Sequence, residues 1–179
     1  MAALYAELAK KKSLELPSVL ARCAVELRHA HMEKTALPCR LAPLVFLTDP
    51  ARMENPIEIV QRLPKGCAVI YRHFGDSRDG AALRELARQQ GRIFLTGNDP
   101  ELAQSLDADG VHFARDAELR GPMKWRAKHP NWILTMAGLK TGHYCAPLDS
   151  LDALFISSVF PSLSPVSYTH LTLPTIYSV

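Results

Sequence analysis

Short apolar runs rich in β-branched and aromatic residues alternate with amphipathic stretches from residue 43 onward. The runs have the length and composition of buried strands, and the stretches between them have the apolar spacing of helices. The predicted strands are Leu44–Thr48, Cys67–Arg72, Arg92–Thr96, Gly110–Phe113, Trp132–Met136 and Ala153–Val159. The predicted helices are Pro56–Leu63, Asp79–Gln90, Pro100–Leu106 and Met123–His129. This alternation predicts an α/β fold with a parallel sheet covered by helices.

The pattern fits two parallel α/β architectures. The units repeat every ~20–25 residues, which suits the (β/α) units of a TIM barrel, although a closed barrel needs eight of them. A doubly wound sheet needs only about five or six strands, so the strand count favours it. However, the turn after the first strand reads Asp49-Pro-Ala-Arg-Met and lacks the glycine pattern of a dinucleotide site. Periodicity alone leaves both architectures open.

The two ends of the chain differ from this α/β region. Residues 1–42 predict a helical extension, with helix-prone sequence from Ala2 to Lys12 and a second helix that begins near Pro17 and ends at Pro38. Residues 43–165 form the α/β region. Residues 166–179 contain no Lys, Arg, Asp or Glu and resemble a non-native tail. We therefore expect the natural protein to continue beyond Pro165.

Composition narrows the class of protein. Of 179 residues, 47% are apolar and 22% are charged, which is typical of a globular protein. The net charge of +3 is too small to indicate nucleic-acid binding, and no run approaches the ~18 apolar residues of a membrane span. Glu7 interrupts the start of the chain before any apolar core, which argues against a secretory signal. Four scattered cysteines without a C-x-x-C pair predict a reduced, cytoplasmic protein.

Polar residues follow most of the predicted strands. Ligands of parallel α/β folds bind at the carboxyl ends of strands, so these residues are the candidates for a site. The strand ends read Thr48-Asp49, Arg72-His73-Phe74-Gly75, Gly97-Asn98-Asp99, His112-Phe113-Ala114-Arg115, Ala137-Gly138 and Ser162-Leu163-Ser164. Arginine recognises phosphate through a planar pair of donors, and serine hydroxyls and loop N–H groups add neutral donors. The combination predicts a phosphorylated or pyrophosphorylated small-molecule ligand.

Each candidate also has a structural interpretation. Asp49 precedes a proline and fits a turn or a helix cap. Arg72 shares a strand face with Ile70, and burial there requires an anionic partner, which a ligand or a structural ion pair would supply. Asp99 precedes Pro100 and fits a helix N-cap better than a metal ligand. His112 lies on a short buried strand, where a hydrogen-bonded core histidine is the more frequent case.

Three segments in register resemble the thiamine phosphate synthase/TenI family. Leu44–Asp49 resembles its first strand, usually L-Y-L-I-T-D; Asp107–Phe113 matches its G-A-D-G-V-H-L strand; and Asp152–Ser164 follows its A-D-Y-I-G-x-G-P-V-F-P-T-x-T segment. The order and spacing agree across residues 44–165. The resemblance implies a (β/α)₈ barrel of which about six units are present.

The resemblance also implies an activity. The family synthase joins hydroxymethylpyrimidine pyrophosphate to thiazole phosphate, giving thiamine phosphate and pyrophosphate, with Mg²⁺ and basic residues around the leaving group. Of the family's Gln-x-Arg-x-Lys, only Arg72 is retained, because Ile70 and Phe74 stand at the flanking positions. The family's Asn-Asp pair corresponds, after a one-residue shift, to Asn98 and Asp99.

The remaining site residues follow from the same comparison. Asp116 lies beside the position of a magnesium ligand, and Ser162 and Ser164 replace the threonines of the last loop. We expect Arg72, Ser162 and Ser164 to be catalytic. Substrate binding is expected from Asp49, Arg72, Asn98, His112, Ser162 and Ser164. Asp99 and Asp116 are the expected metal ligands.

Two alternative functions stay open. A TenI-type thiazole tautomerase would use His112 or a loop residue as its proton shuttle. A barrel that binds thiamine intermediates or a partner without catalysis is the third interpretation, because Phe74 and Pro165 stand where the family has lysines and Ala117 stands where it has a metal-binding aspartate.

Overall fold

The computed structural model describes residues 22, 23, 26, 40–64, 66–114, 120–138 and 148–156. Their strands form one six-stranded parallel sheet: β1 (Val45–Leu47), β2 (Ala68–Tyr71), β3 (Ile93–Gly97), β4 (Gly110–Phe113), β5 (Ile133–Ala137) and β6 (Ala153–Phe155). The connecting helices are α3 (Pro56–Arg62), α4 (Gly80–Gln89), α5 (Pro100–Ser105), α6 (Arg120–Lys128) and the 3₁₀ helix η1 (Leu148–Ser150). Each strand and helix predicted between residues 43 and 156 is therefore present, with shifts at the ends, whereas the two helices predicted before residue 40 lie outside the described residues.

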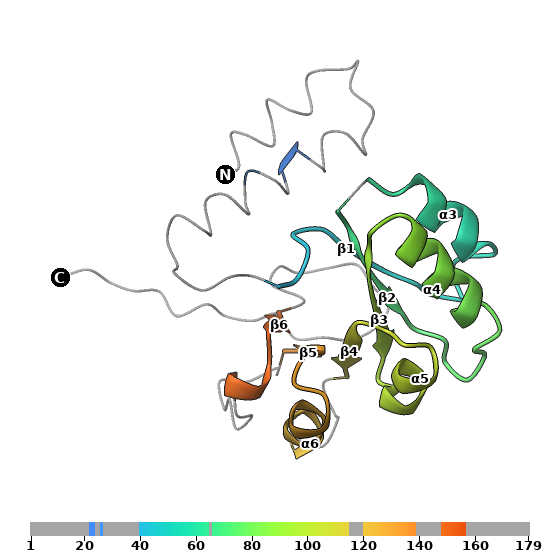
Figure 1. Ribbon diagram of the computed structural model, residues 1–179. Coiled ribbons are helices and arrows are strands. Elements are labelled where there is room, and N and C mark those ends of the chain that lie inside the picture. The colour runs from blue at the N-terminus through green and yellow to red at the C-terminus, as the bar shows by residue number, and fades with distance from the viewer. Residues whose placement is uncertain are drawn as a thin grey trace, which may run out of the picture.

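The strand order distinguishes the two architectures. The strands lie in the sheet in the same order as in the chain, and each neighbouring pair is parallel. Helices α3 to α6 follow the outer side of the curved sheet (Figure 1). A doubly wound sheet reverses its strand order and carries helices on both faces. The described part is a curled half-barrel of the TIM-barrel type, as the family resemblance implied.

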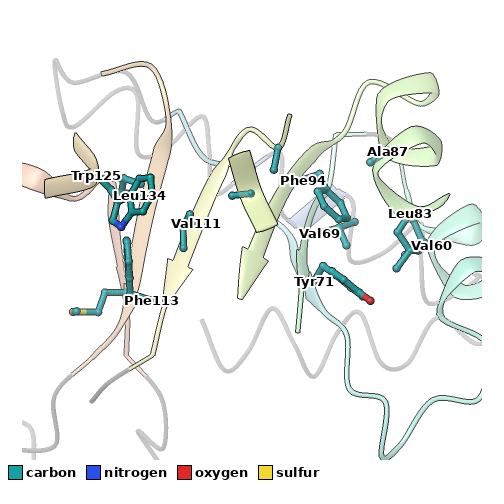
Figure 2. Packing of buried hydrophobic residues seen from close by; sticks show 13 residues of the cluster. Val60, Val69, Tyr71, Leu83, Ala87, Phe94, Val111, Phe113, Trp125 and Leu134 are labelled. Carbon is teal, nitrogen blue, oxygen red and sulfur yellow. The ribbon is translucent and has the colours of Figure 1, made fainter. Parts of the chain in front are cut away.

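The larger hydrophobic core lies between the sheet and these helices. Val69 and Phe94 of the sheet face Val60 of α3 and Leu83 of α4 (Figure 2), and all four side chains are fully buried. The cluster extends through Val111, Phe113, Leu134, Met136 and Trp125 toward α6. Because strand side chains alternate between the two faces, this cluster uses every second residue of each central strand.

The inner face of the sheet carries a second cluster made of the alternate residues. Ala68, Ile70, Leu95 and Ile133 are buried there, together with Leu41 and Ala42 just before β1. The described helices α3 to α6 contribute no buried residue to this cluster. This face leads toward Arg72, which directly follows β2 and continues the face that carries Ile70.

The same arrangement of charges occurs twice at the amino ends of the strands. The Asp109 carboxylate, just before β4, accepts a hydrogen bond of 2.8 Å from the Phe94 N–H and lies 3.3 Å from Arg84 of α4. Asp152, just before β6, likewise accepts from a backbone N–H of β5 and from Arg126 of α6 at 2.5 Å. In barrels this end of the sheet serves stability, so these aspartates hold the fold together.

Gly110 belongs to the segment that resembles the family's G-A-D-G-V-H-L strand. A Cβ at this position would lie 1.9 Å from the carbonyl oxygen of Ile133, and the backbone has φ +157°. The close approach of β4 to β5 therefore requires a residue without a side chain.

Two sequence-based expectations concern composition. Of the four cysteines, the structure describes Cys23 and Cys67; both are free thiols, and Cys67 is buried directly before β2. None of the described helices is long and apolar enough to cross a membrane. The tail after residue 156 and nearly all of the predicted N-terminal extension lie outside the described residues.

Candidate functional site

The carboxyl ends of β1, β2 and β3 bring together several of the predicted site residues. Asp49 follows β1, Arg72 follows β2, and Asn98 and Asp99 follow β3, while His112 lies within β4. A cavity of about 230 Å³ opens beside β1 and β2, lined by Thr48, Asp49, Pro50, Met53, Glu54, Pro56, Tyr71, Arg72, His73, Asp76, Arg78 and Asp79. Asp116, Ser162 and Ser164 lie outside the described residues, so their roles stay predictions.

Arg72 lies at the carboxyl end of β2, and its positively charged side chain continues the inner face of the sheet. Its Nε donates to the carbonyl oxygen of Thr48 at 2.8 Å, and its Nη2 lies 3.3 Å from Oδ2 of Asp49. The Thr48 hydroxyl also accepts from the Arg72 N–H at 2.8 Å and donates to its carbonyl oxygen. The side chain is 34% exposed, and Nη1 has no hydrogen-bond partner among the described residues. Arg72 is thus held by a structural ion pair and still open to a ligand.

Gly97 makes room for Arg72. A Cβ at Gly97 would lie 2.8 Å from Cγ of Arg72 and 3.3 Å from its Cα. Such a contact is well inside van der Waals distance, so a larger residue would displace the arginine stem. The glycine at the end of β3 thus accommodates a side chain of the candidate site.

Asp99 and Asn98 are both engaged by the protein. Oδ1 of Asp99 accepts from the Leu102 N–H at 2.8 Å, which caps α5 as its sequence context predicted. Oδ2 of Asp99 lies 3.0 Å from Nε2 of His73. Asn98 has a left-handed backbone (φ +56°), and its side-chain oxygen accepts from the Ala114 N–H. These two residues fix the β3–α5 turn.

The expected magnesium site was tested against these donors. Within the described residues, no group of three or more His, Cys, Asp or Glu side chains is placed to hold a metal ion. Both carboxylate oxygens of Asp99 already have partners, and Asp116 is not described. Because magnesium is usually bound through one or two carboxylates together with substrate phosphates, the magnesium site stays a prediction, and no chemical step is assigned to a metal.

His73 is a site residue that the sequence analysis did not single out. Its Nδ1 accepts from the Gly75 N–H at 3.1 Å, so the ring proton is on Nε2 and is donated to Asp99. This pair ties the end of β2 to the start of α5. The sequence feature that could have indicated His73 was its position directly after Arg72, at the end of a predicted strand.

His112 is buried on the inner side of β4. Its Nδ1 lies 2.8 Å from the Thr135 hydroxyl, and its ring packs 4.9 Å from the Phe155 ring. Burial, with a smaller contribution from the positive charge of Arg72, lowers the pKa of His112 to about 4. The imidazole is therefore neutral at pH 7, as in a hydrogen-bonded core histidine. Its role in substrate binding stays a prediction.

A larger depression lies at the opposite end of the sheet. It encloses about 710 Å³ between residues that include Arg40, Arg84, Asp109, Lys128 and Trp132. The Arg84–Asp109 ion pair of the amino-end rim forms part of its wall. Because barrels bind their substrates at the carboxyl ends of the strands, this depression is not the candidate site.

Fold and strand ends together define a class: a parallel β/α half-barrel with a polar, arginine-containing site at the carboxyl ends of its strands. No protein-family model matches the chain. Curated relatives do match, and all three are thiamine-phosphate synthases. The synthase of Moorella thermoacetica is 32% identical over 82 residues, which make up 45% of this chain and 39% of that relative.

The other two relatives agree with the first. The Bacillus mycoides enzyme is 38% identical over 82 residues, 45% of this chain and 35% of the relative. The Chromobacterium violaceum enzyme is 46% identical over 39 residues, 22% of this chain and 19% of the relative. The aligned part of the chain thus spans less than two-fifths of each relative. The resemblance to the thiamine phosphate synthase/TenI family is confirmed for this part of the chain.

Among solved structures, a thiamine phosphate pyrophosphorylase from Pyrococcus furiosus is similar to the chain. The TM-score is 0.44 with 22% sequence identity, and the match covers 53% of this chain and 49% of that one.

Proposed function

We propose that this protein couples hydroxymethylpyrimidine pyrophosphate with thiazole phosphate to give thiamine phosphate and pyrophosphate. One observation carries the proposal: the partly exposed Arg72 side chain lies at the carboxyl end of β2, in a chain that is similar to thiamine-phosphate synthases over 82 residues. The cytoplasmic location that we propose is consistent with the free thiols of Cys23 and Cys67.

The proposed chemistry needs positive charge where the pyrophosphate departs. The bond between the pyrimidine methylene carbon and the pyrophosphate oxygen breaks, and its electron pair leaves with the pyrophosphate. The thiazole nitrogen forms the new bond to the same carbon. Nη1 of Arg72 is the donor assigned to the leaving group, because Nε already donates to Thr48 and Nη2 to Asp49. A fixed guanidinium stabilises the developing negative charge without reorganising.

Two features favour a second candidate, a barrel that binds the phosphorylated intermediates without catalysis. The positions that flank Arg72 in the family pattern carry Ile70 and Phe74 instead of Gln and Lys. The Asp49 carboxylate beside Arg72 also offsets part of the positive charge that a leaving group would use. A TenI-type tautomerase would use His112 or a loop residue as its proton shuttle, and the burial that lowers the pKa of His112 to about 4 disfavours the protonated form that a shuttle must pass through.

Binding and activity separate these candidates. We would titrate hydroxymethylpyrimidine pyrophosphate into the protein by calorimetry, with and without Mg²⁺, and compare Arg72→Ala with Arg62→Ala. Arg62 is an exposed arginine on α3 that pairs with Glu58 and serves as the matched control. Losing a charge-assisted contact of ~2 kcal/mol weakens binding about thirtyfold, and we expect this only for Arg72→Ala. Unchanged affinity would remove Arg72 from the site.

Complementation tests the reaction itself. The gene is expressed in a cell that lacks thiamine phosphate synthase and is grown without thiamine. Growth that Arg72→Ala abolishes supports the synthase. Binding of the pyrimidine pyrophosphate without growth, and without thiamine phosphate formation in vitro, supports the non-catalytic barrel. Conversion of a thiazole substrate in the absence of the pyrimidine supports the tautomerase.

A further inference from the structure

Phe74 is the most exposed large apolar side chain in the described part of the chain, with 71% of its surface accessible. It follows Arg72 and His73 at the end of β2 and has a left-handed backbone conformation, φ +46°. A bulky residue has a strained backbone conformation at positive φ, and exposing its ring to water does not stabilise the fold. Two unfavourable features at one rim position indicate a use for that ring.

The turn that presents Phe74 is firmly built. The Gly75 N–H donates to Nδ1 of His73 at 3.1 Å, and the Asp76 N–H donates to the His73 carbonyl oxygen at 2.9 Å. The buried Tyr71 places its hydroxyl 3.1 Å from the Asp76 carbonyl oxygen, to which it donates. His73 is itself anchored by its hydrogen bond to the α5 cap. The exposed position of Phe74 is therefore imposed by the fold of the turn.

The Phe74 ring stands beside the cation of the candidate site. Cζ of Arg72 lies 5.3 Å from the ring centroid, within the range of a cation–π contact. A ligand with a planar aromatic ring and a phosphate group matches this pair of neighbours. Its phosphate would meet the unpartnered Nη1 of Arg72, while its ring would stack on the exposed phenyl face.

We propose that Phe74 is a binding residue that stacks against the aromatic heterocycle of a ligand whose phosphate is bound by Arg72. The inference rests on the proposed function, which supplies a pyrimidine pyrophosphate as that ligand. Phe74 stands where the family pattern has a lysine, so part of the affinity comes from ring stacking rather than from charge. A protein partner is the less suitable occupant, because a single phenyl ring is small beside the ~1,200 Å² that stable interfaces bury.

The test compares two ligands and three variants by calorimetry. The ligands are hydroxymethylpyrimidine pyrophosphate and inorganic pyrophosphate, which lacks the ring. The variants are Phe74→Leu, which removes the π face; Phe74→Trp, which keeps one; and Met123→Leu, a control at another exposed apolar residue, on α6. We expect Phe74→Leu to weaken binding of the pyrimidine compound about tenfold, since base stacking on aromatic side chains contributes on this scale. Inorganic pyrophosphate should bind all variants within twofold, and Phe74→Trp should retain pyrimidine binding.

The other possible results distinguish failure of the stacking inference from failure of the proposed function. Equal weakening of both ligands by Phe74→Leu would mean that the ring only supports Arg72, which overturns stacking. Unchanged pyrimidine binding in Phe74→Leu would overturn the inference and leave the proposed function intact. Failure of the unmodified protein to bind the pyrimidine compound would refute the proposed function and this inference with it. Self-association that Phe74→Leu abolishes would identify an interface instead.

Discussion

Replacing His112 by Asn would remove a buried titrating group while keeping an amide that can bond to the Thr135 hydroxyl. The groups that face this imidazole are Arg72 from β2, Thr135 from β5 and the ring of Phe155 from β6. Burial and the nearby cation both disfavour the protonated ring, which lowers the pKa of His112 to about 4 from an ordinary value of 6.5.

The sign and size of the change in stability with pH follow from the difference between the pKa of His112 in the folded and in the unfolded chain. Above pH 6.5 the histidine is neutral in both the folded and the unfolded chain, and its protonation has no influence on stability. As the pH falls below 6.5, the unfolded chain takes up a proton that the folded protein refuses, so the free energy of unfolding decreases. The pKa difference corresponds to a loss of about 1.4 kcal/mol by pH 5.5 and about 3 kcal/mol by pH 4.

The assay is urea unfolding of the unmodified protein and of His112→Asn at pH 7.5, 5.5 and 4, at constant ionic strength. The surface carboxylates, including Asp76 and Glu85, whose pKa values lie at about 2, titrate alike in both proteins and cancel in the difference. We expect the stability of the unmodified protein relative to the variant to fall by about 3 kcal/mol between pH 7.5 and 4. A difference that does not change with pH, or an NMR titration midpoint of His112 near 6.5, would refute this reasoning.

Three further substitutions test the packing described above. Gly97→Ala places a Cβ 2.8 Å from Cγ of Arg72, so we expect the free energy of unfolding in urea to fall by ~1–3 kcal/mol and pyrophosphate binding to weaken. Unchanged binding would contradict the conclusion that Gly97 makes room for Arg72. Gly110→Ala meets backbone at 1.9 Å and should leave no soluble folded protein by circular dichroism; a cooperative unfolding transition would show that β4 and β5 can separate. Arg92 is buried and donates to the carbonyl oxygens of Val60 and Leu63 at the end of α3. Arg92→Met should therefore lower the free energy of unfolding by ~2–4 kcal/mol in the same assay. The control Arg62→Met, on the surface, should change it by less than ~0.5 kcal/mol.

The strands and helices of this fold were predictable because each depends on a short sequence pattern within its own segment. Apolar runs bounded by turn residues gave six strands and four helices, and Asp99-Pro100 gave the cap of α5. The choice between a barrel and a doubly wound sheet was not local, since both use the same alternation of strands and helices. It depends on strand order and on which face the helices cover. Only the resemblance to a known family indicated the barrel from sequence.

The contacts within the site could not be predicted from the residues themselves. Arg72 and Asp49 are 23 positions apart and meet because β1 and β2 pair in parallel, with Leu47 opposite Ile70. The sequence analysis left ligand and ion pair as alternatives for Arg72, and the structure contains the ion pair. The hydrogen bond between His73 and Asp99 depends in the same way on the register of two strands.

The order of the strands has a consequence for ligand binding. Within the described residues, each strand pairs with its neighbours in the chain, and β1 pairs with β2. The central strands β2 and β4 are fully buried, whereas β1 and β6 are only partly buried. Thr48 and Asp49, which bind Arg72, directly follow β1. Separation of β1 from β2 would therefore also release the guanidinium, and a ligand that binds Arg72 in this arrangement would stabilise the pairing of the two strands.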